Sequence, residues 1–428
     1  MRVLHTTFIL LVLCSAICSA QETLKNKILE NPEFAFVKEK ALSIIKSGFN
    51  AGDGYSEVWI RDYNTFIELS AEVFDYNVLK ENLLVFFRLQ GEDGNIVDGF
   101  IPKSKAVKSE GGYRYIYTEL EPNYCGHKNT VETDHETSLI QAVYKLVKAT
   151  GDATILTEKV GEMSVPERMD FALEFLFRHR WSEKYNLIYG ATTADWGDVQ
   201  HSHPWGVTID ENTHFCLDIY DNAMLLIALD NLIELVPQFA EKWEPVRNDL
   251  AQNIMKVLWD DTNKKFIPHV YLEGSPYPGD FDENQIYYHG GTAVAIEAGL
   301  LDTVEIRNAL NKMLENVRKA NAASIGLTMY PPYPDWAFEN KGMYPYGYQN
   351  GGDWTWFGGR MIQQLIRFGF VEEAYDQIQP MVQRVVRNDG FFEWYTPSNE
   401  PMGSGTFRGS AGVLFKAINM FEMWAGMH

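Results

Sequence analysis

Two kinds of helical pattern alternate along the chain. In the first kind, apolar residues recur at three- and four-residue steps with charged residues between them, which is typical of a helix with one face in water. This kind covers residues 169–176, 239–257, 306–317 and 371–385. The second kind is apolar nearly all round, which indicates a helix that is buried on most sides. It covers residues 66–74, 138–147, 223–233, 291–300, 361–370 and 411–421.

The order of the two kinds predicts how the helices are arranged. A short turn follows each buried helix, and a longer polar and aromatic loop precedes it. Short turns join antiparallel neighbours. Six such hairpins predict an all-α fold, an (α/α)6 barrel with the buried helices as its inner ring, and a helical solenoid is the alternative. Residues 113–120 and 265–274 have short strand-like patterns inside long loops.

The first twenty residues have the pattern of a secretory signal peptide. Arg2 is followed by an apolar run that ends in the small residues Ser19 and Ala20. We expect cleavage near Ala20 and a secreted or periplasmic protein, with a lipoprotein acylated at Cys18 as the less favoured alternative. No other segment has a transmembrane pattern. Residues 21–428 contain no Pro- or Ser-rich linker and are expected to form a single barrel domain.

The net charge limits the possible binding partners, and the cysteine content limits the possible disulfides. The chain has 58 Asp and Glu against 37 Lys and Arg, a formal net charge of −21, which argues against nucleic acid and anionic membranes as partners. It also disfavours polyanionic sugars as substrates. Cys125 and Cys216 remain once residues 1–20 are removed, and either a disulfide or two separate buried thiols fits them.

The loops before the buried helices are expected to meet at one end of the barrel, because each leads into the N-terminus of an inner helix. All of these loops are rich in acids, amides and aromatic residues. They cover residues 56–62, 129–137, 191–205, 284–292, 344–356 and 390–410. We therefore predict a shared pocket there, lined in part by tryptophans, whose flat faces suit sugar rings.

The candidate chemistry in these loops lies in carboxylates. The sequence has no glycine-rich phosphate loop, no GxSxG nucleophile elbow and no CxxC pair. His201 and His203 lack a third ligand at helical spacing, so no metal site and no organic cofactor are expected. Hydrolysis of a glycosidic bond needs two carboxyl groups, one protonated to release the leaving oxygen and one ionised to activate water or attack carbon.

Three acidic residues are candidates for that pair. Asp195 and Asp198 lie beside Trp196, and a carboxyl group against an indole is desolvated, which raises its pKa and suits a general acid. Glu393 lies in the aromatic run "GFFEWY", which indicates a carboxylate held in an aromatic loop. The simpler alternatives are turn-forming or helix-capping aspartates and a glutamate bonded to backbone at the pocket rim.

Other charged residues in the loops have structural alternatives. Arg61 and Asp62 offer planar donors and acceptors that suit sugar hydroxyls, or they form an ion pair at a helix start. The acidic cluster at residues 134–136 is expected to cap the helix that follows. Asp218 and Asp221 lie one turn apart on a buried helix, where their carboxyl groups need partners.

Four segments resemble motifs of the six-hairpin glycosidases, which include glucoamylases, neutral invertases, trehalases, processing α-glucosidases and the glucosidase part of debranching enzymes. "YSEVWIRDYNTFIEL" resembles an Arg-Asp segment of invertases and glucoamylases, and "DGFIPKSKAV" the invertase segment that follows. "YQNGGDWTWFGGR" is similar to the Tyr-x-Asn-Gly-Gly-x-Trp run of invertases and debranching enzymes. "DGFFEWYTPSNEPMGSGTFRGSAG" resembles the terminal Glu-x-Tyr segment. The motifs follow in the same order from about residue 30 to residue 425.

The resemblance implies roles for individual residues. Glu393 would be the general base of an inverting mechanism, and Asp195 matches the general acid best. Processing glucosidases have Ser-Gly-x-Asp where this chain has "TTADWGD", so Asp198 stays a rival acid. The carboxyl groups of Asp195 and Glu393 should then face each other at about 6.5–9.5 Å. The sugar-binding residues would be Trp59, Arg61, Asp62, Trp196, Tyr348, Asn350, Gly351, Gly352, Trp354 and Trp394.

The sequence thus favours a secreted, inverting glycoside hydrolase, for which the resemblance implies an α-linked neutral glucoside or oligosaccharide as substrate. A sugar epimerase or lyase on a similar barrel is one alternative. It would use His or Tyr as its base, and His135, His203 and His289 lie in the loops. A non-catalytic glycan-binding protein is the other alternative, and it would keep the tryptophans while its carboxylates are misplaced or tied up in salt bridges.

Overall fold

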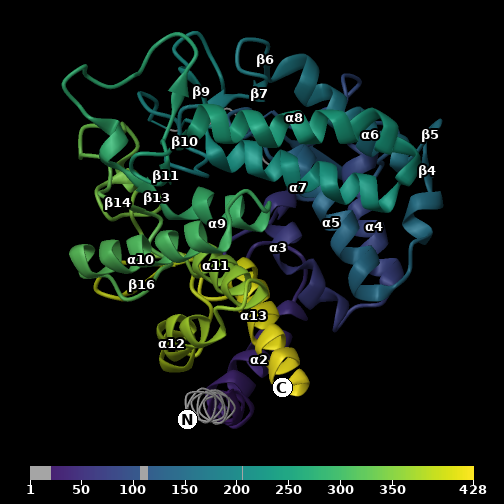
Figure 1. Cartoon of the computed structure of the whole chain (residues 1–428). Coiled ribbons are helices and arrows are strands. Elements are labelled where there is room, and N and C mark those ends of the chain that lie inside the picture. Colours follow the sequence, from purple (N-terminus) through teal and green to yellow (C-terminus); the bar gives the residue numbers. More distant parts are fainter. Residues whose placement is uncertain (1–20, 107–113, 205) are drawn as a thin grey trace, which may run out of the picture.

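Helices dominate the computed structural model, which describes residues 21–106, 114–204 and 206–428 (Figure 1). The expected signal peptide lies outside the described residues. The helices of the apolar kind are α3 (Ile60–Ala71), α5 (His135–Thr150), α7 (Ile219–Leu235), α9 (His289–Glu297), α11 (Thr355–Arg367) and α13 (Arg408–Met427). The one-sided helices are α2 (Pro32–Ile45), α4 (Tyr76–Arg88), α6 (Val165–His179), α8 (Ala240–Leu258), α10 (Thr303–Ala320) and α12 (Val371–Asn388).

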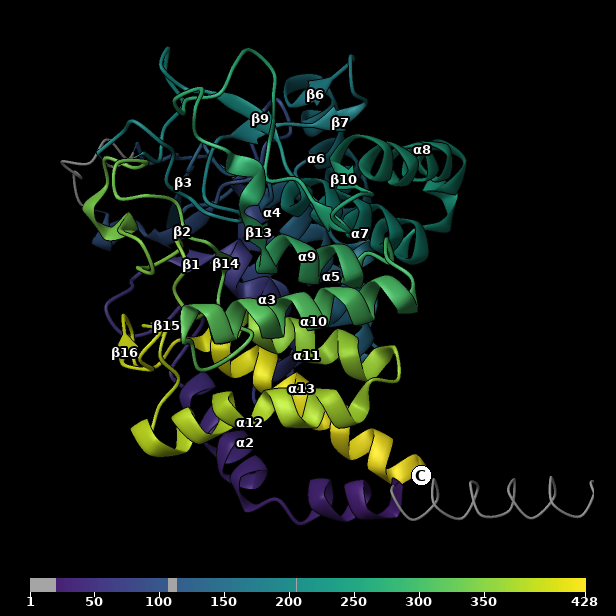
Figure 2. The same cartoon turned by 60° about the vertical axis from the view of Figure 1, so that its left-hand side comes forward.

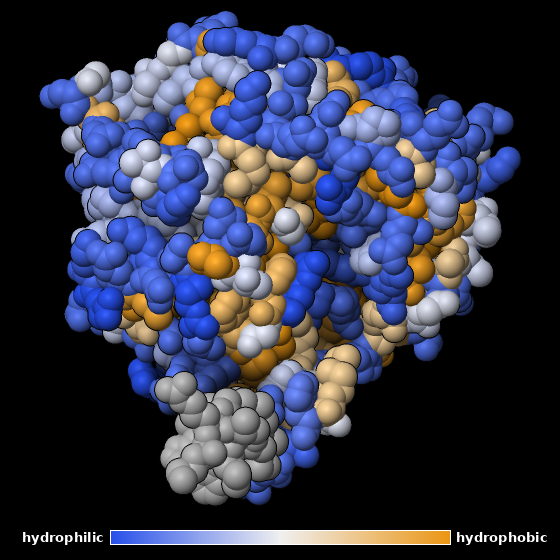
Figure 3. All heavy atoms as spheres, viewed as in Figure 1, coloured by the Kyte–Doolittle hydropathy of each residue, from blue (hydrophilic) through white to orange (hydrophobic). Residues whose placement is uncertain are grey.

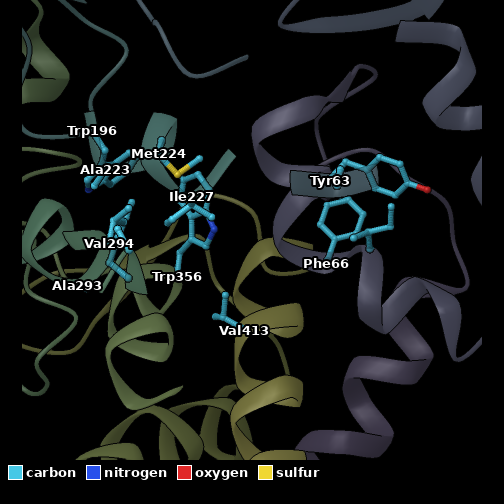
Figure 4. Packing of buried hydrophobic residues seen from close by; sticks show 14 of the residues in the cluster. Tyr63, Phe66, Trp196, Ala223, Met224, Ile227, Ala293, Val294, Trp356 and Val413 are labelled. Carbon is cyan, nitrogen blue, oxygen red and sulfur yellow. The ribbon is translucent and has the colours of Figure 1, made fainter. Parts of the chain in front are cut away.

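The apolar helices form a closed ring. Helix α3 contacts α5, the contacts continue through α7, α9 and α11 to α13, and α13 contacts α3 again. Their side chains converge in the core, where Figure 4 shows Ile227 of α7, Val294 of α9 and Trp356 of α11 close together. Each one-sided helix contacts a ring helix from outside, as α8 does with α7 and α12 with α11. A ring that closes on itself is not a solenoid.

Local sequence explains why the outer helices begin where they do. Ser164 and Glu167 form a capping box at the start of α6, and Asp302 and Glu305 form another at the start of α10. Each box satisfies backbone N–H groups that have no partner within the helix. The hydrophobic stripe then decides which face is buried, because it returns at the helical period. The sequence pattern and the caps therefore agree on these elements.

The strands are short and lie in the loops. One sheet has the antiparallel order β1 (Val58–Trp59), β2 (Gly99–Pro102), β3 (Tyr124–His127). Another has the order β12 (Val270–Tyr271), β9 (Phe215–Leu217), β8 (Gly190–Ala191). The remaining strands pair two by two: β4 (Lys159–Val160) with β5 (Met163–Ser164), β6 (Trp181–Ser182) with β7 (Leu187–Ile188), β10 (Trp259–Asp260) with β11 (Lys265–Phe266), β13 (Tyr287–Tyr288) with β14 (Met329–Tyr330), and β15 (Trp394–Tyr395) with β16 (Pro401–Met402).

Two expectations about strands need correction. Residue 113 lies outside the described residues, and residues 114–120 form no strand, with a single bridge from Ile116 to Gly126. The pattern at residues 265–274 is divided into β11 and β12, which pair with different partners. The alternation in both segments was therefore a weaker signal than the helical one.

Several of the strands lie together at one end of the helices. Figure 2 shows β1, β2, β3, β15 and β16 together at the left-hand end, from which the helices run to the right. Figure 3 shows that the outline of the face seen in Figure 1 is mainly hydrophilic, with apolar residues nearer its middle. Among the described residues, no single helix is long and apolar enough to cross a membrane. Cys125 and Cys216 are both free and buried, so they are separate thiols.

Candidate active site

A pocket lies where the inner helices begin. Its volume is about 120 Å³. Trp59, Arg61 and Asp62 reach it from the start of α3, His135 from the start of α5, and Trp356 from the start of α11. We call it the inner pocket. Its other lining residues are Tyr55, Asp98, Asn129, Glu132, Trp196, Asp198, Tyr348, Gln349, Trp354, Glu393 and Phe407. Five of the six loops that were predicted to meet at one end of the fold therefore line this pocket, and residues 284–292 contribute no lining residue.

A second and larger pocket, the outer pocket, adjoins the first. Its volume is about 490 Å³. The residues that line both pockets are Tyr55, Trp59, Asp198 and Tyr348. The residues that line only the outer pocket are Glu57, Tyr115, His127, Val199, Val207, Asn340 and Gly342. Asp198 therefore stands at the boundary between two spaces, whereas Glu393 lines only the inner one.

Glu393 is fixed at the wall of the inner pocket. It directly precedes β15, and its own N–H donates to the Ser404 carbonyl at 2.9 Å. The Tyr55 hydroxyl donates to Oε2 of Glu393 at 2.8 Å, and the Ser404 N–H donates to the same oxygen at 3.3 Å. Burial raises the pKa of Glu393, and these two donors oppose the rise. The carboxylate is thus held in one orientation toward the pocket.

Asp198 has a fixed backbone and a free carboxyl oxygen. Its N–H donates to Oε1 of Gln349 at 3.3 Å, and its carbonyl accepts from Nδ2 of Asn129 at 3.4 Å. Its Oδ1 atom is buried and has no hydrogen-bond partner among the described residues. An unsatisfied buried carboxyl oxygen is costly. A bound ligand with a hydroxyl or ether oxygen beside it would supply the missing contact.

Asp195 does not reach the pocket that Glu393 lines. Both of its carboxyl oxygens accept from the N–H of Gly291 in the first turn of α9, each at 3.0 Å, and the residue is only 3% exposed. It lines a separate cavity of about 10 Å³ together with Asp218 and Asp221. Burial raises the pKa of Asp195 to about 8. Asp195 is therefore not among the residues that line the inner pocket with Glu393, contrary to the expected arrangement across one pocket.

Arg61 belongs to a buried ion cluster. Its Nε and Nη2 atoms donate to both oxygens of Asp134, at 2.7 and 3.1 Å, and its Nη1 lies 2.5 Å from Oε1 of Glu132. The Tyr220 hydroxyl also donates to Asp134, at 2.7 Å. Burial alone would raise the pKa of Asp134, but Arg61 holds it below its usual range. Asp134 therefore anchors Arg61 and makes no side-chain cap on α5, which corrects the expected capping role.

Asp62 offers a carboxyl group of a different kind. It lines the inner pocket one residue after Arg61. Burial raises its pKa to about 8, because desolvation outweighs the attraction of the Arg61 guanidinium. A raised pKa favours the protonated form, and a protonated carboxyl both donates and accepts hydrogen bonds. This suits a residue that contacts sugar hydroxyls.

Indole rings form part of the wall of the inner pocket. Trp196 packs edge-on against Trp354 and Trp356, with ring centroids 4.8 and 5.3 Å apart. The Nε1 atoms of Trp196 and Trp356 are buried and have no hydrogen-bond partner among the described residues. Both residues line the inner pocket. Two N–H donors without partners beside a pocket are suited to a ligand that carries hydroxyl groups.

The residues of the Asn-Gly-Gly motif stabilise the loop next to the pocket and do not line the pocket. Asn350 is fully buried, and its Oδ1 accepts from the Tyr333 N–H at 2.7 Å. Its Nδ2 donates to the carbonyls of Tyr333 and Met343. Gly351 has a φ of +91°, which other residues rarely adopt. Neither Asn350 nor Gly351 lines the inner or the outer pocket.

Gly352 and Trp394 also line neither the inner nor the outer pocket. A Cβ atom on Gly352 would lie 3.0 Å from the Trp394 ring. That ring packs against the Tyr348 ring, with centroids 6.3 Å apart, and Tyr348 does line the pockets. The sugar-facing roles expected for Asn350, Gly351, Gly352 and Trp394 are thus not supported by their positions. They hold Tyr348 and its loop in place.

The histidines do not form a central pair. His289 is buried and contacts Asn316 and the Ile325 carbonyl, and His203 contacts Asp210 outside the pockets. His135 lines the inner pocket, with its Nε2 2.7 Å from Oε2 of Glu132.

One group among the described residues has metal-ligand geometry, with ligand-type atoms within 4.8 Å of one another: Asp98, Glu132 and His135. Protein partners already hold two of its members. Oδ2 of Asp98 accepts from the Asn129 N–H, and Oδ1 of Asp98 lies 2.5 Å from Nδ1 of His127. Glu132 forms an ion pair with Arg61. His201 and His203 do not converge, since His201 contacts the Ala337 carbonyl.

Sequence reasoning missed several residues that line the inner pocket. They are Tyr55, Asp98, Asn129, Glu132, Gln349, Trp356 and Phe407. Tyr55 lies in the same loop as Arg61 and Asp62, which was the available signal. Glu132 lies three residues before His135, in an acidic loop where the spacing alone does not show which carboxylate faces the pocket.

Comparison of the sequence with family models finds no match, and comparison with curated proteins finds none. Solved structures do resemble the fold. The GH63 mannosylglycerate hydrolase from Thermus thermophilus, in complex with Tris and D-glycerate, is 16% identical over 89% of this chain and 99% of that chain, with a TM-score of 0.61. A rhamnosidase from Klebsiella oxytoca with rhamnose bound is 12% identical over 90% of this chain and 63% of that chain, with a TM-score of 0.57.

Both neighbours are (α/α)6-barrel enzymes of the six-hairpin glycosidase type, in agreement with the resemblance seen in the sequence. At these identities the likeness concerns the fold.

Proposed function

We propose that this protein is a glycoside hydrolase in which Asp198 is the general acid and Glu393 the general base. One observation carries the assignment: both carboxyl groups line the inner pocket, and of the two only Asp198 also lines the outer pocket. A general acid must reach the oxygen between the sugar and its leaving group. A residue at the boundary of two adjoining pockets is placed for that task.

The mechanism follows from the two positions. The sugar occupies the inner pocket and the leaving group the outer pocket. Asp198 donates a proton to the glycosidic oxygen, while Glu393 takes a proton from a water molecule that attacks the anomeric carbon from the opposite face. The configuration at that carbon is thereby inverted. Tyr55 keeps Glu393 oriented and favours its ionised form, as the base requires.

The other pocket groups bind the sugar. Protonated Asp62 and the indole N–H groups of Trp196 and Trp356 contact hydroxyls, and the ring faces pack against C–H groups. Arg61, which is bonded to Asp134 and Glu132, presents a fixed guanidinium group to the inner pocket. The substrate is a neutral sugar, and the resemblance in the sequence favours an α-linked glucoside. The expected signal peptide assigns the activity to a secreted or periplasmic protein.

The neighbours support the class of reaction. A mannosylglycerate hydrolase and a rhamnosidase share the fold, and both names describe enzymes that cleave glycosides. An epimerase or lyase finds less support, because His289 and His203 lie outside the inner pocket and His135 is engaged by Glu132. A non-catalytic glycan-binding protein remains an outcome of the test below.

The test is hydrolysis of a panel of aryl glycosides and natural disaccharides by purified residues 21–428. NMR of the first product then identifies its anomer. We expect hydrolysis of a neutral glycoside with inversion, and loss of activity in Glu393→Gln. Retention of configuration would refute the acid–base pair. Binding of glycans without hydrolysis anywhere on the panel would refute the enzyme and leave a binding protein.

A further inference from the structure

The outer pocket determines which leaving groups the protein accepts, if Asp198 is the acid as proposed above. The two pockets meet at Asp198, Tyr55, Trp59 and Tyr348. A group bonded to a sugar in the inner pocket must therefore leave past these residues into the outer pocket. The outer pocket is about four times as large, at about 490 Å³ against about 120 Å³. It thus has room for a leaving group that is bulky compared with a methyl group.

The wall of the outer pocket is mainly apolar. Aromatic rings of Tyr55, Trp59, Tyr115 and Tyr348 face it, and Val199 and Val207 complete the apolar surface. The four aromatic residues are only partly buried. Partly exposed aromatic and branched side chains around one cavity gain free energy when an apolar group covers them.

The charges around the outer pocket disfavour an anionic leaving group. Its lining includes the carboxylate of Glu57 and, among the described residues, no Lys or Arg. His127 is the one basic group, and it lies 2.5 Å from the Asp98 carboxylate, which already balances its charge. A carboxylate that entered this pocket would lose part of its hydration and meet the like charge of Glu57 without an unpaired cation.

We propose that the outer pocket is a leaving-group site for a neutral, apolar aglycone, either alkyl or aryl. An apolar group is favoured over a second sugar, because the rings of the four aromatic residues and the side chains of Val199 and Val207 form most of the wall. The polar side chains of the lining are Glu57, His127, Asp198 and Asn340, together with the tyrosine hydroxyls. The substrate is then a glycoside of a lipid-like or phenolic alcohol, and the sugar itself is chosen by the inner pocket.

The test compares leaving groups on one sugar, the sugar that the panel above shows to be cleaved. Octyl and methyl glycosides differ in apolar area but little in the acidity of the leaving alcohol. We expect kcat/KM for the octyl glycoside to exceed that for the methyl glycoside at least tenfold. We also expect kcat/KM for a 4-carbamoylphenyl glycoside to exceed that for its 4-carboxyphenyl counterpart at least tenfold. The kcat/KM for a disaccharide of the same sugar should be lower than that for the octyl glycoside.

Two variants link the preference to the pocket. Tyr115→Ala should reduce the octyl-to-methyl ratio severalfold, because Tyr115 lines only the outer pocket. Tyr117→Ala is the matched control, since Tyr117 is 59% exposed and lines neither pocket. A ratio of two rates is independent of the fraction of protein that is folded. An unchanged ratio in Tyr115→Ala, or an equal change in both variants, would overturn the proposal.

The outcome separates this inference from the function on which it rests. Hydrolysis without any preference for apolar leaving groups, or with a preference for the carboxylate or the disaccharide, overturns only the leaving-group site. Absence of hydrolysis overturns the proposed function. In that case calorimetry with octyl and methyl thioglycosides, which resist cleavage, decides the leaving-group site: tighter binding of the octyl compound supports it, and equal binding overturns it.

Discussion

Replacement of Tyr55 by Phe tests how the proposed base is kept ionised. The Tyr55 hydroxyl donates to Oε2 of Glu393 at 2.8 Å, in a site where Glu393 is 4% exposed. A donor that bonds to a carboxylate favours its ionised form. Tyr55→Phe removes the donor and leaves the ring, so the pKa of Glu393 should rise further above its usual range.

The size of the change follows from the geometry. A hydrogen bond to a charged group contributes about 1.5–3 kcal/mol, and about 1.4 kcal/mol corresponds to one pKa unit. The full loss would therefore raise the pKa by about 1–2 units. Glu393 keeps the Ser404 N–H, and Tyr55 is partly exposed so that water can replace its hydroxyl. We expect a rise of about one unit.

The assay is the pH dependence of kcat/KM on the glycoside that the panel identifies. The base must be ionised, so the acidic limb of the profile reports the pKa of Glu393 in the free enzyme. This limb should move to higher pH by about one unit in Tyr55→Phe. Tyr115→Phe is the control, because Tyr115 lines only the outer pocket and Glu393 lines only the inner pocket. A limb that stays in place or moves to lower pH would refute the base assignment.

Three further predictions concern residues outside the proposed acid–base pair. Asn350→Ala should lower the free energy of unfolding in urea by about 2–4 kcal/mol, because three buried hydrogen bonds are lost. The KM should stay within about threefold of the wild-type value. Unchanged stability would contradict the structural role of Asn350. Burial raises the pKa of Asp195 to about 8, so ionisation of its carboxyl group destabilises the fold as pH rises from about 4 through 8. In denaturation curves, Asp195→Asn should therefore gain stability relative to the wild type across that pH window. A stability difference that does not change with pH would contradict this prediction. Cys125 and Cys216 are free, so a thiol assay on denatured residues 21–428 should find both thiols, and a reductant should leave Tm unchanged; a drop in Tm would indicate a disulfide.

The fold could be predicted from the sequence because two independent signals agree. Helices that are apolar all round, such as residues 223–233, alternate with striped helices such as residues 306–317. The first kind has to be buried and the second has to face water. Short turns after the buried helices then fix the pairing, and the ring of contacts from α3 to α13 follows.

The sequence could not show which of the two aspartates lines the inner pocket, because a three-residue offset decides it. Asp195 and Asp198 both neighbour Trp196, so the argument from desolvation by an indole applied to each. Asp195 has a φ of +54°, in the left-handed region that Asp tolerates better than most residues. That turn directs Asp195 to Gly291 and leaves Asp198 at the pocket, and no pattern of residue types reveals it.

The prediction for the motif "YQNGGDW" agrees with the structure in part: Tyr348 and Trp354 line the inner pocket, whereas Asn350, Gly351 and Gly352 do not. Its polar and glycine residues fitted a surface that contacts sugar, but Asn350 satisfies backbone groups of Tyr333 and Met343, and Gly351 supplies a positive φ. A loop that presents Tyr348 to a pocket needs such internal bonds. Sequence alone does not separate the residues that contact a ligand from those that shape the loop.

The most direct test of the central claim is a comparison of kcat for Asp198→Asn and Asp195→Asn on the same glycoside. Removal of a general acid costs about 10²–10⁴-fold. We predict a loss of this size in Asp198→Asn and a change of less than about tenfold in Asp195→Asn, whose carboxyl group is bonded to Gly291 and lies outside the inner pocket. The opposite result, a large loss in Asp195→Asn with Asp198→Asn nearly as active as the wild type, would contradict the account.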